Sequence, residues 1–286
     1  MQQPSTRSRS GSNASPSGHI KLWQVDSFTD KPFSGNPAAV CMLAEPATEN
    51  WMQSFAEEMN LSETSFVVPD PFPGRFHLRW FTPRVEVDLC GHATLAAARV
   101  IFDLGLVQGP VPIEFLSRSG SLFCRRSADD AISLDFPSTP IIDSASTDVA
   151  EAVSDALGIE PVSVHRSAYD LVAILDGPQQ LRALTPNFQK LLLIDTRGLI
   201  VTSPSDDEGT DFLSRFFAPR CGIDEDPVTG SAHCCLAPYW SAVLGKSSVI
   251  GYQASRRGGT VRCEVQGDRT HLTGHAITVF EASWLR

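Results

Sequence analysis

The feature of this sequence that most constrains its fold is an internal repeat. The segment Arg79–Arg84 (RWFTPR) in the first half matches Arg215–Arg220 (RFFAPR) in the second. Each is followed by a Gly-x-Ala motif, at Gly91 and Gly230, and then by a run of small and apolar residues. A repeat of this kind fixes the architecture before any local structure is considered. We therefore expect two pseudo-symmetric lobes.

The two apolar runs predict one helix each, over 92–104 and 231–244, and each run ends at a glycine, as helix C-termini often do. The first run contains two charged residues and the second contains none, which predicts helices that are enclosed on every side. Short alternating runs around them read as strands. The sequence thus predicts an α+β fold in which a curved, mostly antiparallel sheet or barrel wraps around one central helix in each lobe.

A second set of matching features precedes the two repeated segments Arg79–Arg84 and Arg215–Arg220. In each half the pattern predicts a strand (38–43 and 171–175), then one amphipathic helix, then another strand. We place the N-terminal lobe at 19–138 and the C-terminal lobe at 139–286, with a last strand that is able to cross back to the first lobe. Residues 1–18 hold only two apolar residues and predict a disordered tail, with an organelle transit peptide as the alternative.

Composition narrows the classes of partner. With 23 basic and 33 acidic residues the formal charge is −10, and no dense basic block is present, which argues against binding nucleic acid or an anionic membrane. No run approaches the roughly 18 apolar residues of a membrane span, and the N-terminus lacks the apolar core of a secretory signal. The seven scattered cysteines read as reduced thiols. We expect a cytoplasmic protein that acts on a small molecule.

The starts of the two apolar helices are the predicted binding site. Unpaired N–H groups and the helix dipole attract anions there, and Gly91 and Gly230 allow a ligand close to the backbone. If the two starts face each other across an interlobe cleft, a substrate that carries a carboxylate is the natural ligand. Nucleotide-binding and metalloprotease motifs are absent from the sequence, so we expect no cofactor and no metal. A zinc site is disfavoured, because adjacent helical residues point about 100° apart; its candidate ligands are Cys221, His233, Cys234 and Cys235.

Three polar residues are candidates for acid–base work. Glu63 lies where an amphipathic helix gives way to an apolar strand, a position that can raise a carboxyl pKa, although an exposed turn acid fits as well. His92 follows Gly91 and either orients an anion, relays a proton or is a capping or core imidazole. Asp226 lies four residues before Gly230 and is either a second acid–base group or a charge at a helix end.

Two further residues lie at the helix starts. Ser231 corresponds to His92 under the repeat and either binds substrate or caps its helix. Cys90 precedes Gly91, and a thiol near a helix N-terminus can become a base or nucleophile. Its counterpart before Gly230 is Thr229, so inversion by two opposed cysteines is excluded.

Four motifs together resemble those of the phenazine biosynthesis-like (PhzF-like) isomerase family. They are DSF (26–28) with FSGNPA (33–38), NLSET (60–64), DLCGHAT (88–94) and DPVTGSA (226–232), in the family's order. The resemblance implies the diaminopimelate-epimerase-like fold and a homodimer. It also implies that Glu63 moves a proton within a dihydro-hydroxyanthranilate-type substrate without a cofactor, with His92, Asp226 and Ser231 in the active site.

The residues and the resemblance together favour isomerisation by a single base. One carboxylate that removes a proton and returns it on the same face shifts a double bond, whereas stereoinversion needs a base on each face. The alternatives are a racemase that uses Cys90 together with Glu63 and a non-catalytic ligand-binding or interaction protein. A hydrolase built on Cys90 and His92 is weaker, because neighbouring residues at a helix start are expected to point apart.

Overall fold

The computed structural model describes residues 20–285, so the predicted tail at 1–18 lies outside the described residues. Within this range the chain forms one mixed sheet of 18 strands and six α-helices, which confirms the α+β class. None of the helices in this range has the length and apolar character needed to cross a membrane.

The elements of the first half run in the order β1 (Lys21–Ser27), β2 (Asn36–Met42), α1 (Glu49–Met59), β3 (Glu63–Pro69), β4 (Arg75–Phe81), β5 (Glu86–Val87), α2 (Gly91–Asp103), β6 (Ile113–Ser117), β7 (Gly120–Arg126) and β8 (Ile132–Pro137). Those of the second half are β9 (Asp143–Ser144), α3 (Thr147–Leu157), β10 (Ser163–Arg166), β11 (Leu171–Ile174), α4 (Pro178–Ala183), α5 (Phe188–Leu191), β12 (Leu199–Pro204), β13 (Phe212–Ala218), a 3₁₀ turn (Pro219–Cys221), β14 (Ile223–Asp226), α6 (Gly230–Leu244), β15 (Ser248–Gln253), β16 (Gly259–Gln266), β17 (Arg269–Gly274) and β18 (Ala276–Ser283).

The two halves use the same pattern of strand pairing. In the first half β2 pairs in parallel with β3, and β4 pairs in parallel with β6. In the second half the equivalent parallel pairs are β11 with β12 and β13 with β15. The other ladders are antiparallel, as the alternating runs predict. The repeated motifs of the sequence therefore lie on equivalent elements of the two halves.

Helices α2 and α6 form the centre of the two halves. The strands β1, β2, β3, β8 and β18 pack on α2, and β15, β16 and β17 pack on α6. Helix α2 is buried from His92 to Phe102 except at Arg99, so its predicted enclosure is confirmed. The prediction is wrong for the last turn of α6, where Val243 is 57% exposed and Leu244 is 39% exposed. Single apolar side chains are commonly exposed on soluble proteins, so the lack of charge did not require burial.

Outer helices cover the other face of each half. The aromatic side chains of Trp51 and Phe55 on α1 pack on Phe66 of β3. In the second half the single amphipathic helix expected after β11 is two short helices, α4 and α5, because Pro186 between them prevents a continuous helix. Helix α3, which the sequence reading did not include, adds to this outer layer.

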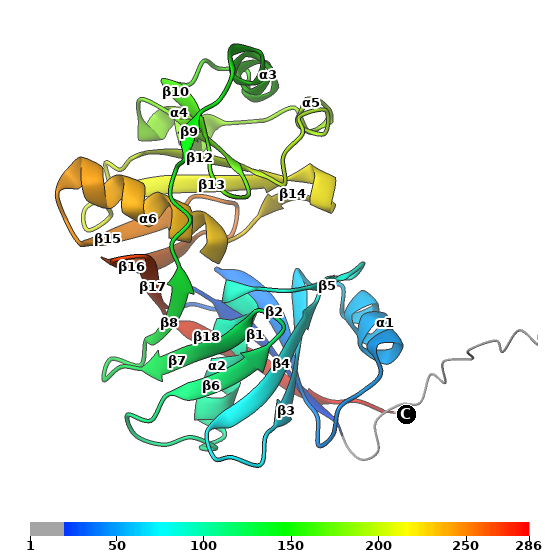
Figure 1. The fold of residues 1–286 in the computed structure, drawn as a ribbon. Coiled ribbons are helices and arrows are strands. Elements are labelled where there is room, and N and C mark those ends of the chain that lie inside the picture. Colours follow the sequence, from blue (N-terminus) through cyan, green and yellow to red (C-terminus); the bar gives the residue numbers. More distant parts are fainter. Residues whose placement is uncertain (1–19, 286) are drawn as a thin grey trace, which may run out of the picture.

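Two strand exchanges join the halves (Figure 1). Strands β8 and β17 pair with each other in antiparallel fashion across the seam. The chain then leaves β8 for β9, which pairs with β10, and leaves β17 for β18, which returns to pair with β1. Beside this seam the starts of α2 and α6 meet. A methyl group placed on Gly91 would lie 3.5 Å from the Cα of Gly230.

Packing against α6 depends on a glycine in β15. A methyl group at Gly251 would lie 2.6 Å from Cε2 of Phe212 and 3.0 Å from Cδ2 of His233, and both rings are buried. We predict that Gly251→Ala lowers the free energy of unfolding by about 1–3 kcal/mol, measured by urea denaturation. Ser248→Ala, at an exposed position of the same strand, is the control. An unchanged midpoint in Gly251→Ala would contradict this packing.

Candidate active site

Glu63 is the first residue of β3 and lies against the start of α2. The helix before it ends at Asn60, whose left-handed backbone (φ 49°) stops α1 and turns the chain into the strand. The Glu63 side chain is 12% exposed, and its Oε2 lies 3.0 Å from Nε2 of His92. The structure thus confirms that Glu63 lies at the junction of a helix and a strand. Because its side chain is mostly buried, the alternative of an exposed turn acid does not fit.

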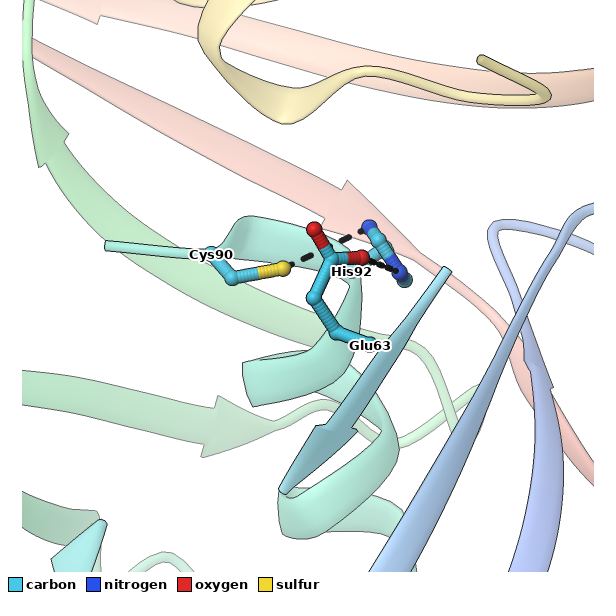
Figure 2. A group of neighbouring side chains, drawn as sticks. All are labelled: Glu63, Cys90 and His92. Atoms are coloured by element: carbon cyan, nitrogen blue, oxygen red, sulfur yellow. Dashed lines mark hydrogen bonds and ion pairs between the residues drawn. The ribbon is translucent and has the colours of Figure 1, made fainter. Parts of the chain in front are cut away.

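His92 is the second residue of α2, and its ring contacts the Glu63 carboxylate and the Cys90 thiol (Figure 2). Nε2 faces Glu63, while Nδ1 lies 3.5 Å from Sγ of Cys90 and 3.2 Å from Nδ2 of Asn36. Burial alone would lower the pKa of His92, but the neighbouring Cys90 and Glu63 side chains raise it above its ordinary value. The imidazole is therefore held ready to carry a positive charge beside a carboxylate.

The contact between Glu63 and His92 is an ion pair without hydrogen-bond alignment. Neither Oε2 of Glu63 nor Nε2 of His92 has a hydrogen-bond partner within residues 20–285, although both atoms are buried. Buried polar atoms in proteins are nearly always satisfied, and those that are not call for an explanation. Here the explanation is that the two atoms face each other at 3.0 Å, as a buried ion pair at the start of α2.

Asp226 brings the second half to the same place. It is the last residue of β14 and accepts hydrogen bonds from Nδ2 of Asn36, at 2.8 Å, and from the hydroxyl of Thr229. Burial raises its pKa to about 6. The Asn36 side chain contacts both His92 and Asp226, so one amide links the candidate acid–base residues of the two halves.

The starts of both central helices lack side-chain caps. Neither Cys90 nor Thr229, the N-cap residues, hydrogen-bonds the first turn of its helix through its side chain. Ser231 does not serve as the cap, because it lies inside α6 and its hydroxyl accepts a hydrogen bond from Nη2 of Arg197 at 3.1 Å. The first-turn N–H groups of two helices therefore converge near Gly91 and Gly230, an arrangement that suits an anion.

Cys90 and His92 meet, contrary to the expectation that residues at a helix start point apart. The extended backbone of Cys90 (φ −146°, ψ 113°) turns its side chain back over the first turn, where Sγ contacts Nδ1 of His92. Burial and the charge of Glu63 raise the pKa of Cys90. A neutral thiol is therefore favoured at this position, which weakens Cys90 as a base or nucleophile.

The same residues are the only group in residues 20–285 whose donor atoms could gather on a metal, since one ligand atom from each of Glu63, Cys90 and His92 lies within 4.8 Å of the others. The ring, however, presents Nδ1 to the thiol and Nε2 to the carboxylate, so its two nitrogens each already contact one of the other two side chains. The alternative zinc ligands do not gather: Cys221 is exposed, whereas Cys234 is buried. The arrangement suits proton transfer better than metal binding.

Sequence reasoning missed three residues that support the site. Asn36 and Thr229 lie within two of the motifs that carry the family resemblance, which was the available signal. Gln253 is fully buried and binds the segment before α6 through both ends of its amide. Its Nε2 donates to the backbone carbonyl of Asp226 at 2.7 Å, and its Oε1 accepts from the N–H of Thr229 at 2.8 Å. No pattern in the sequence predicted this long-range contact.

The fold is of a class shared with epimerases and racemases. The solved structure of a hydroxyproline epimerase from Agrobacterium vitis covers 93% of this chain and 92% of its own with a TM-score of 0.58, at 10% sequence identity. Residues 25–282 match the family model described as phenazine biosynthesis-like protein, and the chain belongs to that family.

Close relatives agree with this assignment. An uncharacterized isomerase of Halalkalibacterium halodurans is 47% identical over 264 residues, which cover 92% of this chain and 98% of the relative. The crystal structure of a PhzF-family phenazine biosynthesis protein from Enterococcus faecalis is 37% identical, covers 94% of this chain and 100% of its own, and has a TM-score of 0.88. The family resemblance expected from the motifs is confirmed.

The raised pKa of Asp226 predicts a pH dependence of stability. The folded carboxyl keeps its proton up to about pH 6, against 3.8 for the ordinary group, so the folded state binds more protons between these values and stability falls as pH rises. We predict that Asp226→Asn gains roughly 3 kcal/mol relative to wild type between pH 4 and pH 7.5, by chemical denaturation at each pH. Asp224→Asn, an exposed acid of the same strand, is the control. A constant gap would contradict the prediction.

The buried, neutral Cys90 thiol predicts low reactivity. With iodoacetamide at pH 7.5 we expect exposed Cys221 to be alkylated well before Cys90, as measured by peptide mass spectrometry over time. Labelling of Cys90 at the rate of Cys221 or faster would show a reactive thiolate and reverse this reading.

Proposed function

We propose that this protein is an isomerase that moves a proton within a small carboxylic acid, of the dihydro-hydroxyanthranilate type or a related one, without a cofactor. The observation that carries the proposal is the buried ion pair of Glu63 with His92 at the uncapped start of α2, with the two facing atoms 3.0 Å apart. The names of the close relatives as isomerases support the reaction class.

In the proposed reaction Glu63 is the proton carrier. Its carboxylate removes a proton from a carbon of the substrate, and the electron pair of that C–H bond forms a new double bond as the neighbouring double bond shifts. The carboxyl group then returns the same proton to the carbon at the far end of the shifted system. The substrate keeps its formula, and no oxidant or reductant is needed.

The surrounding residues stabilise the charge that moves. His92, with its raised pKa, balances the negative charge of Glu63 between turnovers. Asp226, with a pKa of about 6, is partly protonated near neutral pH and can donate a hydrogen bond to the substrate. Ser231 and the N–H groups at Gly91 and Gly230 bind the substrate and stabilise the anion that develops as the proton leaves.

The site is proposed to lie between lobes 19–138 and 139–286, with the substrate held at the meeting point of α2 and α6. A homodimer is part of this proposal on the family resemblance alone, and a cytoplasmic location is part of it on the composition of the chain.

A two-base racemase that uses Cys90 is the second candidate, because the thiol contacts His92. Two observations argue against it. Cys90 and Glu63 both come from the first half of the chain and lie close together beside one imidazole, and the pKa of Cys90 is raised. A non-catalytic binding protein is the third candidate, and it would need no proton carrier at Glu63.

The direct test is replacement of Glu63. In D₂O, with dihydro-hydroxyanthranilate and a panel of small unsaturated and α-amino acids followed by proton NMR, we predict that Glu63→Gln lowers turnover or hydrogen exchange by about 10²–10⁴-fold. Cys90→Ala is the matched control and should retain activity within about tenfold. Exchange that survives in Glu63→Gln but is lost in Cys90→Ala would support the racemase. A wild type without exchange across the panel would support the binding protein.

A further inference from the structure

The second half of the chain has an arginine beside the position that corresponds to Glu63. Thr64 pairs with Phe81 in the first half and Leu199 pairs with Phe217, the matching residue of the repeat, in the second, so Gly198 stands at the position of Glu63. Arg197, one residue earlier, is the side chain that reaches the start of α6. Its Nη2 lies 3.1 Å from the hydroxyl of Ser231.

This contact mirrors the one described above. Ser231 follows Gly230 as His92 follows Gly91, so each central helix meets one charged side chain at its second residue. In the first half the partner is the carboxylate of Glu63, and in the second it is the guanidinium of Arg197. The two helix starts meet at Gly91 and Gly230, and the acid contacts the start of one helix while the cation contacts the start of the other.

Asp170 and two aromatic rings hold the Arg197 side chain in place. Its Nε donates to Oδ1 of Asp170 at 2.9 Å and its Nη2 donates to Oδ2, and the Asp170 side chain is only 3% exposed. The rings of Tyr169 and Phe216 lie 5.3 and 5.8 Å from the guanidinium carbon. Gly198 allows this packing, since a methyl group there would lie 2.7 Å from Cε2 of Phe216. The Arg197 side chain nevertheless remains 41% exposed.

A guanidinium held in this way is suited to one kind of ligand. The Nε–Nη2 edge of the guanidinium is taken by Asp170, so a ligand carboxylate is left the Nη1–Nη2 edge, where Nη2 now donates to Ser231. Two parallel hydrogen bonds from that edge suit a carboxylate, and a fixed side chain loses little freedom on binding. The Ser231 hydroxyl and the uncapped start of α6 add further donors at the same place. Glu63, by contrast, is an acid and would repel a carboxylate from the start of α2.

We propose that Arg197 binds the carboxylate of the substrate and makes the enzyme selective for acids over neutral analogues. The inference rests on the proposed function and gives it a direction: the carboxylate points to Arg197 and α6, and the carbon that exchanges its proton points to Glu63 and α2. The substrate class is then a small acid whose labile C–H bond lies at the other end from its carboxylate.

The test compares an acid with its neutral form. The probes are 3-hydroxyanthranilate, a planar analogue of the proposed substrate type, and the corresponding amide, with binding followed by isothermal titration calorimetry. We expect wild type to prefer the acid, and Arg197→Gln to weaken binding of the acid at least about tenfold while leaving the amide unchanged. No preference for the acid in wild type, or an unchanged acid affinity in Arg197→Gln, would overturn the proposal.

Loss of Arg197 also leaves Asp170 buried without its partner, which can disturb the fold. The double variant Asp170→Asn/Arg197→Gln removes both charges and should lose the acid preference in the same way. Arg220→Gln is the matched control, because Arg220 binds Asp195 in the same loop and is 44% exposed. If Arg220→Gln loses the acid preference to the same extent, the effect is one of loop structure and the proposal fails.

The two proposals fail separately. Glu63→Gln should still bind the acid in preference to the amide although it no longer exchanges protons. Under turnover, Arg197→Lys should raise KM more than it lowers kcat, because it retains the charge and loses the fork. If Glu63 proves essential while Arg197→Gln binds the acid normally, the isomerase stands and the carboxylate assignment falls.

Discussion

The structure depends on the close approach of two helix starts. Gly91 and Gly230 lie so near each other that a methyl group on Gly230 would be 3.4 Å from the Cα of Gly91. The N–H groups of both first turns, which no side chain caps, thus point into the same small region. Like dipole ends repel, so this arrangement gains from negative charge placed between them. The acids of the site and an anionic ligand both meet that need.

The sheet holds the two helix starts together. Strand β8 pairs with β17 across the seam. The chain crosses the seam from β8 to β9, which pairs in the second half, and again from β17 to β18, which pairs in the first half. Separation of the halves would break these ladders and expose a core cluster that spans both helices. The Asn36 amide adds a polar link, because it contacts His92 from its own half and Asp226 from the other. The site is therefore a product of the whole fold.

Much of the fold and most of the candidate site could be predicted from the sequence, because the repeated motifs consist of residues with strong local structural preferences. The Gly-x-Ala motifs predicted the helix starts, and the change from helical to strand pattern placed Glu63 at the head of β3. The split of one expected helix into α4 and α5 was missed although Pro186 signals it. The exposed end of α6 could not be predicted, since an apolar sequence permits burial but does not require it.

Contacts between distant segments were the other limit. The backbone of Cys90 turns its thiol toward His92, and Arg197 reaches Ser231 from 34 positions away. Local patterns contain no information on either contact, because tertiary packing sets both. The pairing of Arg197 with Asp170, 27 positions apart, is likewise set by tertiary packing.

The central claim is that one carboxyl group takes a proton and returns it. It is tested most directly by following the hydrogen itself, with a substrate that shows Glu63-dependent exchange and that carries deuterium at the carbon which loses its proton. In H₂O, at low conversion, a single carboxyl carrier predicts that part of the deuterium reappears at the new position on the same face of the product. Complete loss of deuterium together with inversion at the labelled carbon would contradict the account and require a second base.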